Sequence, residues 1–233
     1  MTIRHSELLN QDVASVRAAI RSGSFVGQTA GLAAGKLQAN LVILPSEHAE
    51  SFETYCHENP RPCPLVGKTD VGNPNWTTLG DINIVSDVPR YNIYRDGVLD
   101  RSATDISDLW QDNWVAFALG CSFTFEAALL RAGVPVHHIA ADRTVPMYRT
   151  NVETKPAGPF RGGMVVSMRR IPEDTLDSLT ILKRPIFPVR SVWVPPQSSL
   201  LKSARETTRT RSPYFSSNRA VAPDLKASSA SIS

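Results

Sequence analysis

The sequence has no long hydrophobic run, few cysteines and no glycine-rich phosphate loop. No apolar stretch approaches the roughly 18 residues that cross a membrane, and the first residues lack the apolar core of a signal peptide. The three cysteines, Cys56, Cys63 and Cys121, cannot form a fully paired disulfide framework, which favours a reducing compartment. We therefore expect a cytoplasmic protein, with the mitochondrial matrix as the second choice, that has no membrane partner and no cofactor.

Positive charge is concentrated near the end of the chain. The residues from Thr175 onward contain nine lysines and arginines against three acids, whereas the whole chain has 25 basic and 22 acidic residues. The preceding body is consequently mildly acidic, and no basic stripe with interleaved aromatic residues runs through it. This distribution argues against a nucleic-acid partner.

The apolar pattern predicts an α/β fold. Helical spacing is found over Ser6–Ile20, over 46–57 behind Ser46 as N-cap, over Thr104–Trp110 and over Phe125–Ala132. Short apolar runs predict strands at 41–44, 82–85, 91–94, 136–140 and 164–168, and at 114–119, which also fits a buried turn of helix. Because helices and strands alternate, we expect mixed sheets flanked by helices, in one domain or two interleaved α/β subdomains.

The composition changes near Asp177, which predicts three regions. Residues 1–177 form the α/β domain, and residues 178–196 form a loosely packed segment that contains prolines. Residues 197–233 are rich in serine, threonine and arginine and lack apolar periodicity. Such a segment buries too little apolar area to offset the entropy of ordering it, so we expect a disordered basic tail that contributes nothing to the fold.

The segment Gly120–Glu126 (GCSFTFE) places a thiol, a hydroxyl and a carboxylate between an apolar element and a helix. Backbone N–H groups are unpaired where a helix begins, and the helix dipole favours anions there. The junction therefore suits a carboxylate substrate or a reactive Cys121. The structural alternative is that Ser122 caps a core helix while Cys121 packs as a small apolar residue.

Six motifs occur in order along the body: Gln38–Pro45, Asn59–Pro64, Ser86–Tyr91, Gly120–Glu126, Val145–Asn151 and Val165–Arg169. With these motifs the chain resembles the hydro-lyase family, whose members include the N-terminal region of the mitochondrial D-glutamate cyclase. The resemblance extends over about Gly27 to Asp174. Asn83 and Val85 stand where the family usually has Asp and Arg. The family's later α/β region has no counterpart after Asp174, so we expect part of the family fold or site to be missing.

The resemblance implies a reaction that releases water, which needs a base, an acid and a clamp for a carboxylate. Among catalytic groups, we predict Glu126 as base or acid, Cys121 as acid or nucleophile, and Tyr148 as a hydroxyl donor. The structural alternative for Glu126 is an exposed first-turn residue that interacts with the helix dipole. The predicted substrate-binding residues are Ser122, Arg149, Arg90, Asp87 and Tyr91.

Arginine has the planar fork that binds a carboxylate through two hydrogen bonds, which is the reason for choosing Arg90 and Arg149. The structural alternative is that each arginine pairs with a carboxylate, Asp87 in the case of Arg90. A metal site at Cys56, His57 and Cys63 matches no standard zinc spacing, and a strand would send His137 and His138 to opposite faces.

The expected function is a hydro-lyase that acts on a small carboxylate or amino acid. The family relationship suggests the conversion of D-glutamate to 5-oxo-D-proline. The alternative is a non-catalytic module that binds a small ligand or a protein, inactive because the family's C-terminal region is missing. Apolar surface left uncovered near Met164–Met168 would promote homo-oligomers.

Overall fold

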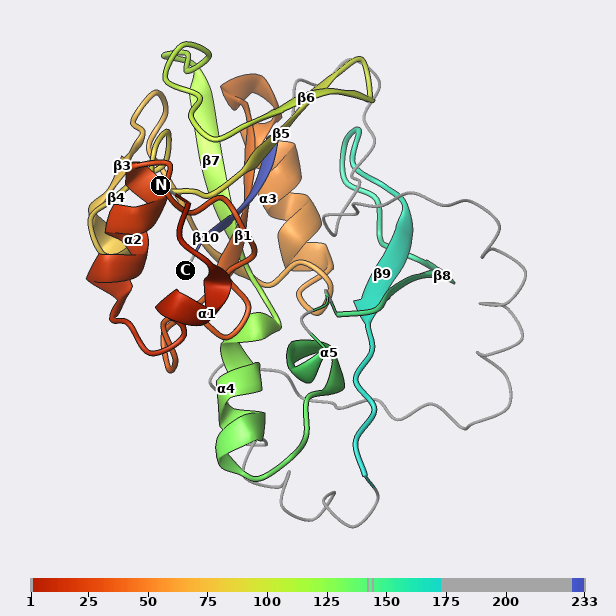
Figure 1. The fold of residues 1–233 in the computed structure, drawn as a ribbon. Helices are drawn as coiled ribbons and strands as arrows, with labels where there is room; N and C mark the ends of the chain where they lie inside the picture. Colours follow the sequence, from red (N-terminus) through yellow and green to blue (C-terminus); the bar gives the residue numbers. More distant parts are fainter. Residues whose placement is uncertain (1, 142, 144, 173–227, 233) are drawn as a thin grey trace.

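A six-stranded sheet, ordered β2-β7-β1-β10-β5-β6, lies at the centre of the computed structural model (Figure 1). The structure describes residues 2–141, 143, 145–172 and 228–232. The α/β class is confirmed, because helices accompany the antiparallel sheets. Within the described ranges every strand pairing of the sheet is antiparallel, so the expectation of mixed sheets is wrong for these strands.

The strands of the central sheet follow the short apolar runs of the sequence. Their bounds are β1 Ala39–Pro45, β2 Leu65–Lys68, β5 Tyr91–Arg95, β6 Val98–Ala103, β7 Trp114–Gly120 and β10 Ser228–Ile232. β7 is buried at its first six positions, because it lies inside the sheet and both of its faces are covered. Two small antiparallel pairs lie apart from it: β3 Asn75–Trp76 with β4 Ile82–Asn83, and β8 Met147–Glu153 with β9 Gly163–Ser167.

The two faces of the sheet carry separate apolar clusters. Since side chains alternate along a strand, Leu41 and Ile43 of β1 face one cluster, whereas Leu44 faces the other. Helix α3, Ala49–Glu58, covers the second face with Phe52, Tyr55 and Cys56. The first face packs against residues of the β3–β4 region and of the segment that leads into β7.

The N-terminal helical pattern forms two helices, not one. Helix α1 spans His5–Leu8 and α2 spans Val13–Arg21, because the Asp12 side chain accepts a hydrogen bond from the Ser15 N–H (2.7 Å) and caps a new helix. Gly23 has a φ of 69°, so glycine allows the left-handed turn after α2. Arg21 of α2 pairs with Asp87, which fixes the helix to the loop before β5.

Three further local predictions differ from the structure. Residues 46–48 form a 3-10 turn (η1) with no side-chain cap, and a second 3-10 turn, η2, spans Thr77–Leu79. Instead of a helix, Thr104–Trp110 contains a turn in which Asp105 Oδ1 accepts from the Ser107 N–H (2.7 Å). The run 136–140 is the short helix α5, His137–Ala140, and not a strand.

The polar junction lies where β7 ends and α4, Phe123–Arg131, begins (Figure 1). Thr124 fixes this helix to the start of β1: its hydroxyl donates to the Gln38 carbonyl (3.2 Å) and accepts from the Gln38 N–H (2.9 Å). The Cys121 N–H donates to the same carbonyl (2.8 Å). These contacts hold the junction against the central sheet.

The predicted proline-containing segment 178–196 lies outside the described residues, and so do residues 197–227 of the predicted tail. Its last part does not fit the prediction of complete disorder, because Ser228–Ile232 forms β10 between β1 and β5. Among the helices that the structure describes, none is long and apolar enough to cross a membrane.

Candidate functional site

Glu126 is the centre of the candidate site and is completely buried. Its Oε1 atom accepts from Arg169 Nε (2.9 Å) and from Arg169 Nη2, and it lies 2.9 Å from His138 Nε2. Its other oxygen, Oε2, is buried and has no hydrogen-bond partner among the described residues. The alternative of an exposed first-turn glutamate is therefore wrong.

Arg169 connects this carboxylate to two serines. Its Nη2 donates to Ser122 Oγ (3.0 Å) and its Nη1 donates to Ser167 Oγ (3.0 Å). The two serine oxygens are 3.4 Å apart, and the guanidinium carbon lies 4.8 Å from the centre of the Phe125 ring. The arginine side chain is only 8% exposed, so a buried charge is compensated mainly by Glu126. We call Ser122, Glu126, His138, Ser167 and Arg169 the Glu126 cluster.

Three separate elements bring the Glu126 cluster together. Ser122 and Glu126 come from the start of α4, His138 comes from α5, and Ser167 ends β9. Ser122 does not act as a side-chain N-cap, so the structural alternative for its hydroxyl is wrong. That hydroxyl instead accepts from Arg169 and forms a hydrogen bond with Ser167 Oγ in which either hydroxyl can be the donor.

Cys121 lies beside the cluster and is partly exposed. Burial of the thiol raises the pKa of Cys121, the Glu126 charge raises it further, and the Phe123 N–H, Arg169 and Asn40 oppose these effects. A raised pKa means that the protonated thiol persists at neutral pH. This favours Cys121 as a proton donor over a thiolate nucleophile.

The β8–β9 pair places Tyr148 and Arg149 on opposite faces. Met147 pairs with Ser167, Tyr148 with Val166, and Arg149 with Val165. Directly paired residues share a face of an antiparallel sheet, so Arg149 lies on the face of Ser167 and Tyr148 on the other. Arg149 is exposed, whereas Tyr148 is partly buried. The pairing favours Arg149 over Tyr148 as a neighbour of the Glu126 cluster.

The remaining predicted binding residues have structural contacts of their own. Asp87 is buried and accepts from Arg21 Nε (2.7 Å), Arg21 Nη2 (2.6 Å) and the Asn83 N–H (3.0 Å). Burial opposes ionisation of Asp87, but the Arg21 and Asn83 hydrogen bonds outweigh it and lower the pKa of that carboxyl. The partner of Asp87 in these contacts is thus Arg21, not Arg90.

Tyr91 is also buried, and its hydroxyl donates to the Ile84 carbonyl. Burial raises the pKa of Tyr91, so its hydroxyl stays protonated. Arg90 is exposed and its Nη2 donates to the Val26 carbonyl (3.4 Å). For Asp87 and Tyr91 these contacts favour structural roles over substrate binding.

Sequence reasoning did not give roles to His138, Ser167 or Arg169. His138 was expected on a strand, whereas it belongs to α5 and contacts a residue 12 positions earlier. Ser167 and Arg169 lie at the end of the motif Val165–Arg169. Their spacing of two residues is the signal from which a shared site could have been predicted. Two extended residues at that spacing lie on one face, and Arg169 does donate to Ser167.

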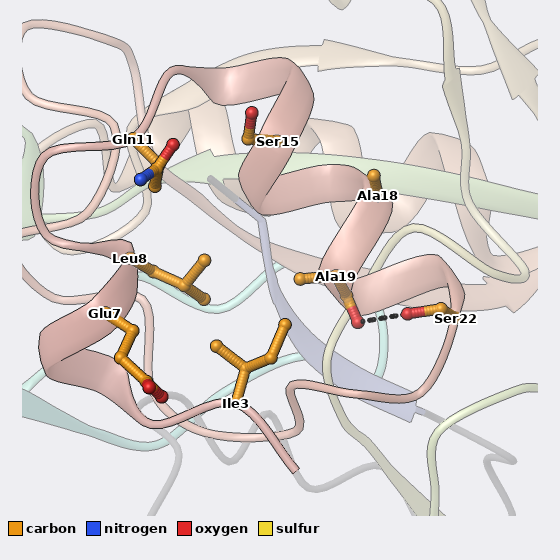
Figure 2. Close-up of a pocket in the computed structure, with 8 residues that line it drawn as sticks. All are labelled: Ile3, Glu7, Leu8, Gln11, Ser15, Ala18, Ala19 and Ser22. Carbon is orange, nitrogen blue, oxygen red and sulfur yellow. Dashed lines mark hydrogen bonds between the residues drawn. The ribbon is translucent and has the colours of Figure 1, made fainter. Parts of the chain in front are cut away.

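A shallow groove between α1 and α2 shares no residue with the Glu126 cluster. Figure 2 shows Leu8, between Glu7 and Gln11, on one side of the groove and Ala18 and Ala19 of α2 on the other. Among the described residues no group of three or more His, Cys, Asp or Glu could hold a metal ion. Cys56 and Cys63 are both buried, and the hydrogen bond between their thiols raises the pKa of Cys56 and lowers that of Cys63.

Comparison with known proteins assigns the chain to a family. The model of the family described as D-glutamate cyclase matches residues 115–190, a range that contains the whole Glu126 cluster. A protein of Ruegeria pomeroyi named "Putative hydro-lyase" is 55% identical over 185 residues, which cover 79% of this chain and 67% of that protein.

Two other relatives carry the same name. One from Dinoroseobacter shibae is 58% identical over 181 residues, covering 77% of this chain and 60% of the relative. One from a Jannaschia species is 59% identical over 167 residues, covering 71% of this chain and 63% of the relative. This chain thus spans about two thirds or less of the length of these relatives. At this identity and coverage, the chain belongs to the hydro-lyase family that the D-glutamate cyclase model describes.

Proposed function

We propose that the protein is a lyase that releases water from a small carboxylate or amino acid, with D-glutamate as the first candidate substrate. The observation that carries this proposal is the buried Glu126 carboxylate, held by His138 and Arg169 next to a protonated thiol and a serine hydroxyl. A water-releasing reaction needs both a proton acceptor and a proton donor. The Glu126 cluster with Cys121 supplies both kinds of group.

The substrate carboxylate requires a positive partner. Arg169 is already bonded to Glu126, Ser122 and Ser167, so its charge is compensated within the cluster. Arg149 is exposed and shares the face of Ser167, and its planar fork suits a carboxylate. We assign substrate binding to Arg149 together with the Ser122 hydroxyl.

The reaction from D-glutamate to 5-oxo-D-proline balances without another reactant. The amine nitrogen forms a bond to the side-chain carboxyl carbon, and one carbon–oxygen bond of that carboxyl breaks. The ammonium group loses two protons during the reaction, and the departing oxygen gains two and leaves as water. The base accepts protons from nitrogen, while Cys121 donates to the departing oxygen and is then reprotonated.

Proton NMR on the full chain with D-glutamate tests the proposal, with L-glutamate and 2- and 3-hydroxydicarboxylates as parallel substrates. We expect 5-oxoproline from D-glutamate, or an unsaturated acid from a hydroxy acid. Replacement R149M should raise KM by about tenfold or more, since a charge-assisted pair is lost. The matched control is R101M, which removes another exposed arginine on β6.

A ligand-induced rise in melting temperature without any turnover would instead favour the non-catalytic binding module. Absence of both turnover and binding with all these acids, from a protein shown to be folded, would refute the proposal.

A further inference from the structure

We propose that His138 is the general base of this reaction and that Glu126 is the residue that positions it. The inference rests on the proposed function for its chemistry, but its geometric part can be tested without substrate. Nothing in the family name assigns either residue a role.

The hydrogen bonds determine which nitrogen of His138 carries a proton. Glu126 Oε1 accepts from Arg169, whose guanidinium nitrogens are donors only. An oxygen that accepts from Arg169 also acts as an acceptor towards His138, which lies 2.9 Å away through Nε2. The neutral imidazole therefore carries its proton on Nε2, and Nδ1 keeps the lone pair.

Glu126 is poorly placed to act on a substrate directly. It is completely buried, and the oxygen that is bonded already receives contacts from His138 and Arg169. A carboxylate that fixes the tautomer and orientation of a histidine, while the other ring nitrogen accepts a proton, is a recurring arrangement in catalysis. In this chain Arg169 holds the carboxylate and the carboxylate holds the ring.

The proton transfers are balanced as follows. Nδ1 of His138 takes a proton from the substrate, from nitrogen in the cyclisation or from carbon in an elimination, and the ring becomes an imidazolium. The electron pair that is freed forms the new bond to carbon, and the carbon–oxygen bond breaks. The Cys121 thiol protonates the departing oxygen, and the imidazolium returns its proton to the thiolate through solvent. In the elimination one such transfer from carbon lets the hydroxyl leave as water. In the cyclisation the transfer occurs twice, so that nitrogen loses two protons and the departing oxygen gains two and leaves as water.

The charged group that contacts His138 is Glu126 of α4. Arg169, which follows β9, and Cys121, which precedes α4, both interact with Glu126 and with each other. On its own side, His137 is the exposed neighbour in α5, and the Arg143 N–H donates to the His138 carbonyl (2.8 Å).

Nitrogen-15 NMR of the histidine rings and kinetics of two matched variants test the inference. In the wild-type chain the His138 signals should show a protonated Nε2 and an unprotonated Nδ1 in the neutral ring. H138Q should lower kcat by about 10²–10⁴-fold with little change in KM, as expected for the loss of a general base. H137Q, which changes the exposed neighbour, should keep the wild-type rate.

The results separate this inference from the proposed function. Turnover by the wild type together with an unchanged kcat in H138Q would overturn the inference and leave the function standing. If no substrate is turned over, the tautomer still tests the inference. A His138 ring protonated on Nδ1, with Nε2 unprotonated, would rule out the proposed hydrogen bond from Nε2 to Glu126.

If H138Q does not fold, E126Q provides the second test, because loss of the carboxylate charge should lower kcat while the amide oxygen still accepts from Nε2. An unchanged kcat in E126Q would count against the positioning role.

Discussion

Glu126 is the residue on which the candidate site depends, and its burial changes what a substitution should do. An exposed first-turn glutamate could be replaced by glutamine with little effect on stability. In the structure Arg169 is 8% exposed and relies on this carboxylate, so a neutral amide leaves a buried positive charge poorly compensated. The local segment Gly120–Glu126 could be singled out from the sequence, but its partners could not, because Arg169 lies 43 positions away.

A double-mutant cycle measures this pair. We expect E126Q alone to lower the free energy of unfolding by about 3–5 kcal/mol, as for a buried ion pair that has lost one partner. The double variant with R169M should be less destabilised than the sum of the single variants, with a coupling of about 1–3 kcal/mol, because it leaves no unpaired charge. Urea unfolding checks both values, and additive effects would contradict the pairing.

Cys121 gives a prediction about pH. Because burial raises the pKa of its thiol, alkylation of Cys121 by iodoacetamide should remain slow until the pH exceeds the usual thiol range of about 8.5. The unfolded thiol ionises first as the pH rises. The stability linked to Cys121 is therefore complete below the ordinary thiol pKa and is lost as the pH rises through the folded one.

Mass spectrometry of the labelled peptide follows the alkylation, and urea unfolding of wild type and C121S follows the stability. Rapid labelling of Cys121 at pH 7 would mean that the thiolate is accessible, and the proton-donor role would have to be abandoned.

At the scale of elements, the strands were easier to predict than the helix ends. The apolar runs 114–119, which also fit a buried turn of helix, and 164–168 both form strands in the structure. Short helices depend on single side chains: Asp12 begins a second helix, and Asp105 forms a turn where a helix was expected. The helix α5 could not be predicted from His137–Ala140, because four residues give no measurable period.

Thr124 provides a test of how α4 is held. Replacement T124V keeps the shape of the side chain but removes both hydrogen bonds to Gln38, so the buried Gln38 N–H loses its partner. We expect a loss of about 1–3 kcal/mol in stability. The matched control T104V, at an exposed position, should have little effect. Equal unfolding midpoints for T124V and T104V would show that Thr124 does not hold the helix.

At the scale of the whole molecule, the end of the chain has a different role from the one expected. A basic tail that contributes nothing was predicted from its composition, yet β10 pairs with β1 at five positions and with β5 at three. Composition could not reveal this, because the serine-rich run Ser228–Ile232 gains its hydrogen bonds from strands far away in the sequence.

Removal of residues 228–233 should therefore destabilise the protein, since β1 and β5 would each lose a strand partner and become exposed edges. The expected result is a lower melting temperature and stronger association in light scattering than for the full chain. Val166 and Met168, each 38% exposed, add apolar surface near β9. An unchanged melting temperature after the truncation would show that β10 does not support the sheet.

The central claim is that the Glu126 cluster is the active site of a water-releasing enzyme. Its most direct test compares the rate of 5-oxo-D-proline formation by wild type with the rate by Ser122→Ala. Ser122 contacts Arg169 and Ser167 at the junction beside Cys121, and its replacement removes one hydroxyl from a partly exposed position. The account predicts turnover by the wild type and a rate lower by about 10²-fold in a folded S122A, typical of a lost hydrogen-bond donor at a reacting oxygen. If a folded S122A formed 5-oxo-D-proline at the full wild-type rate, this result would contradict the claim.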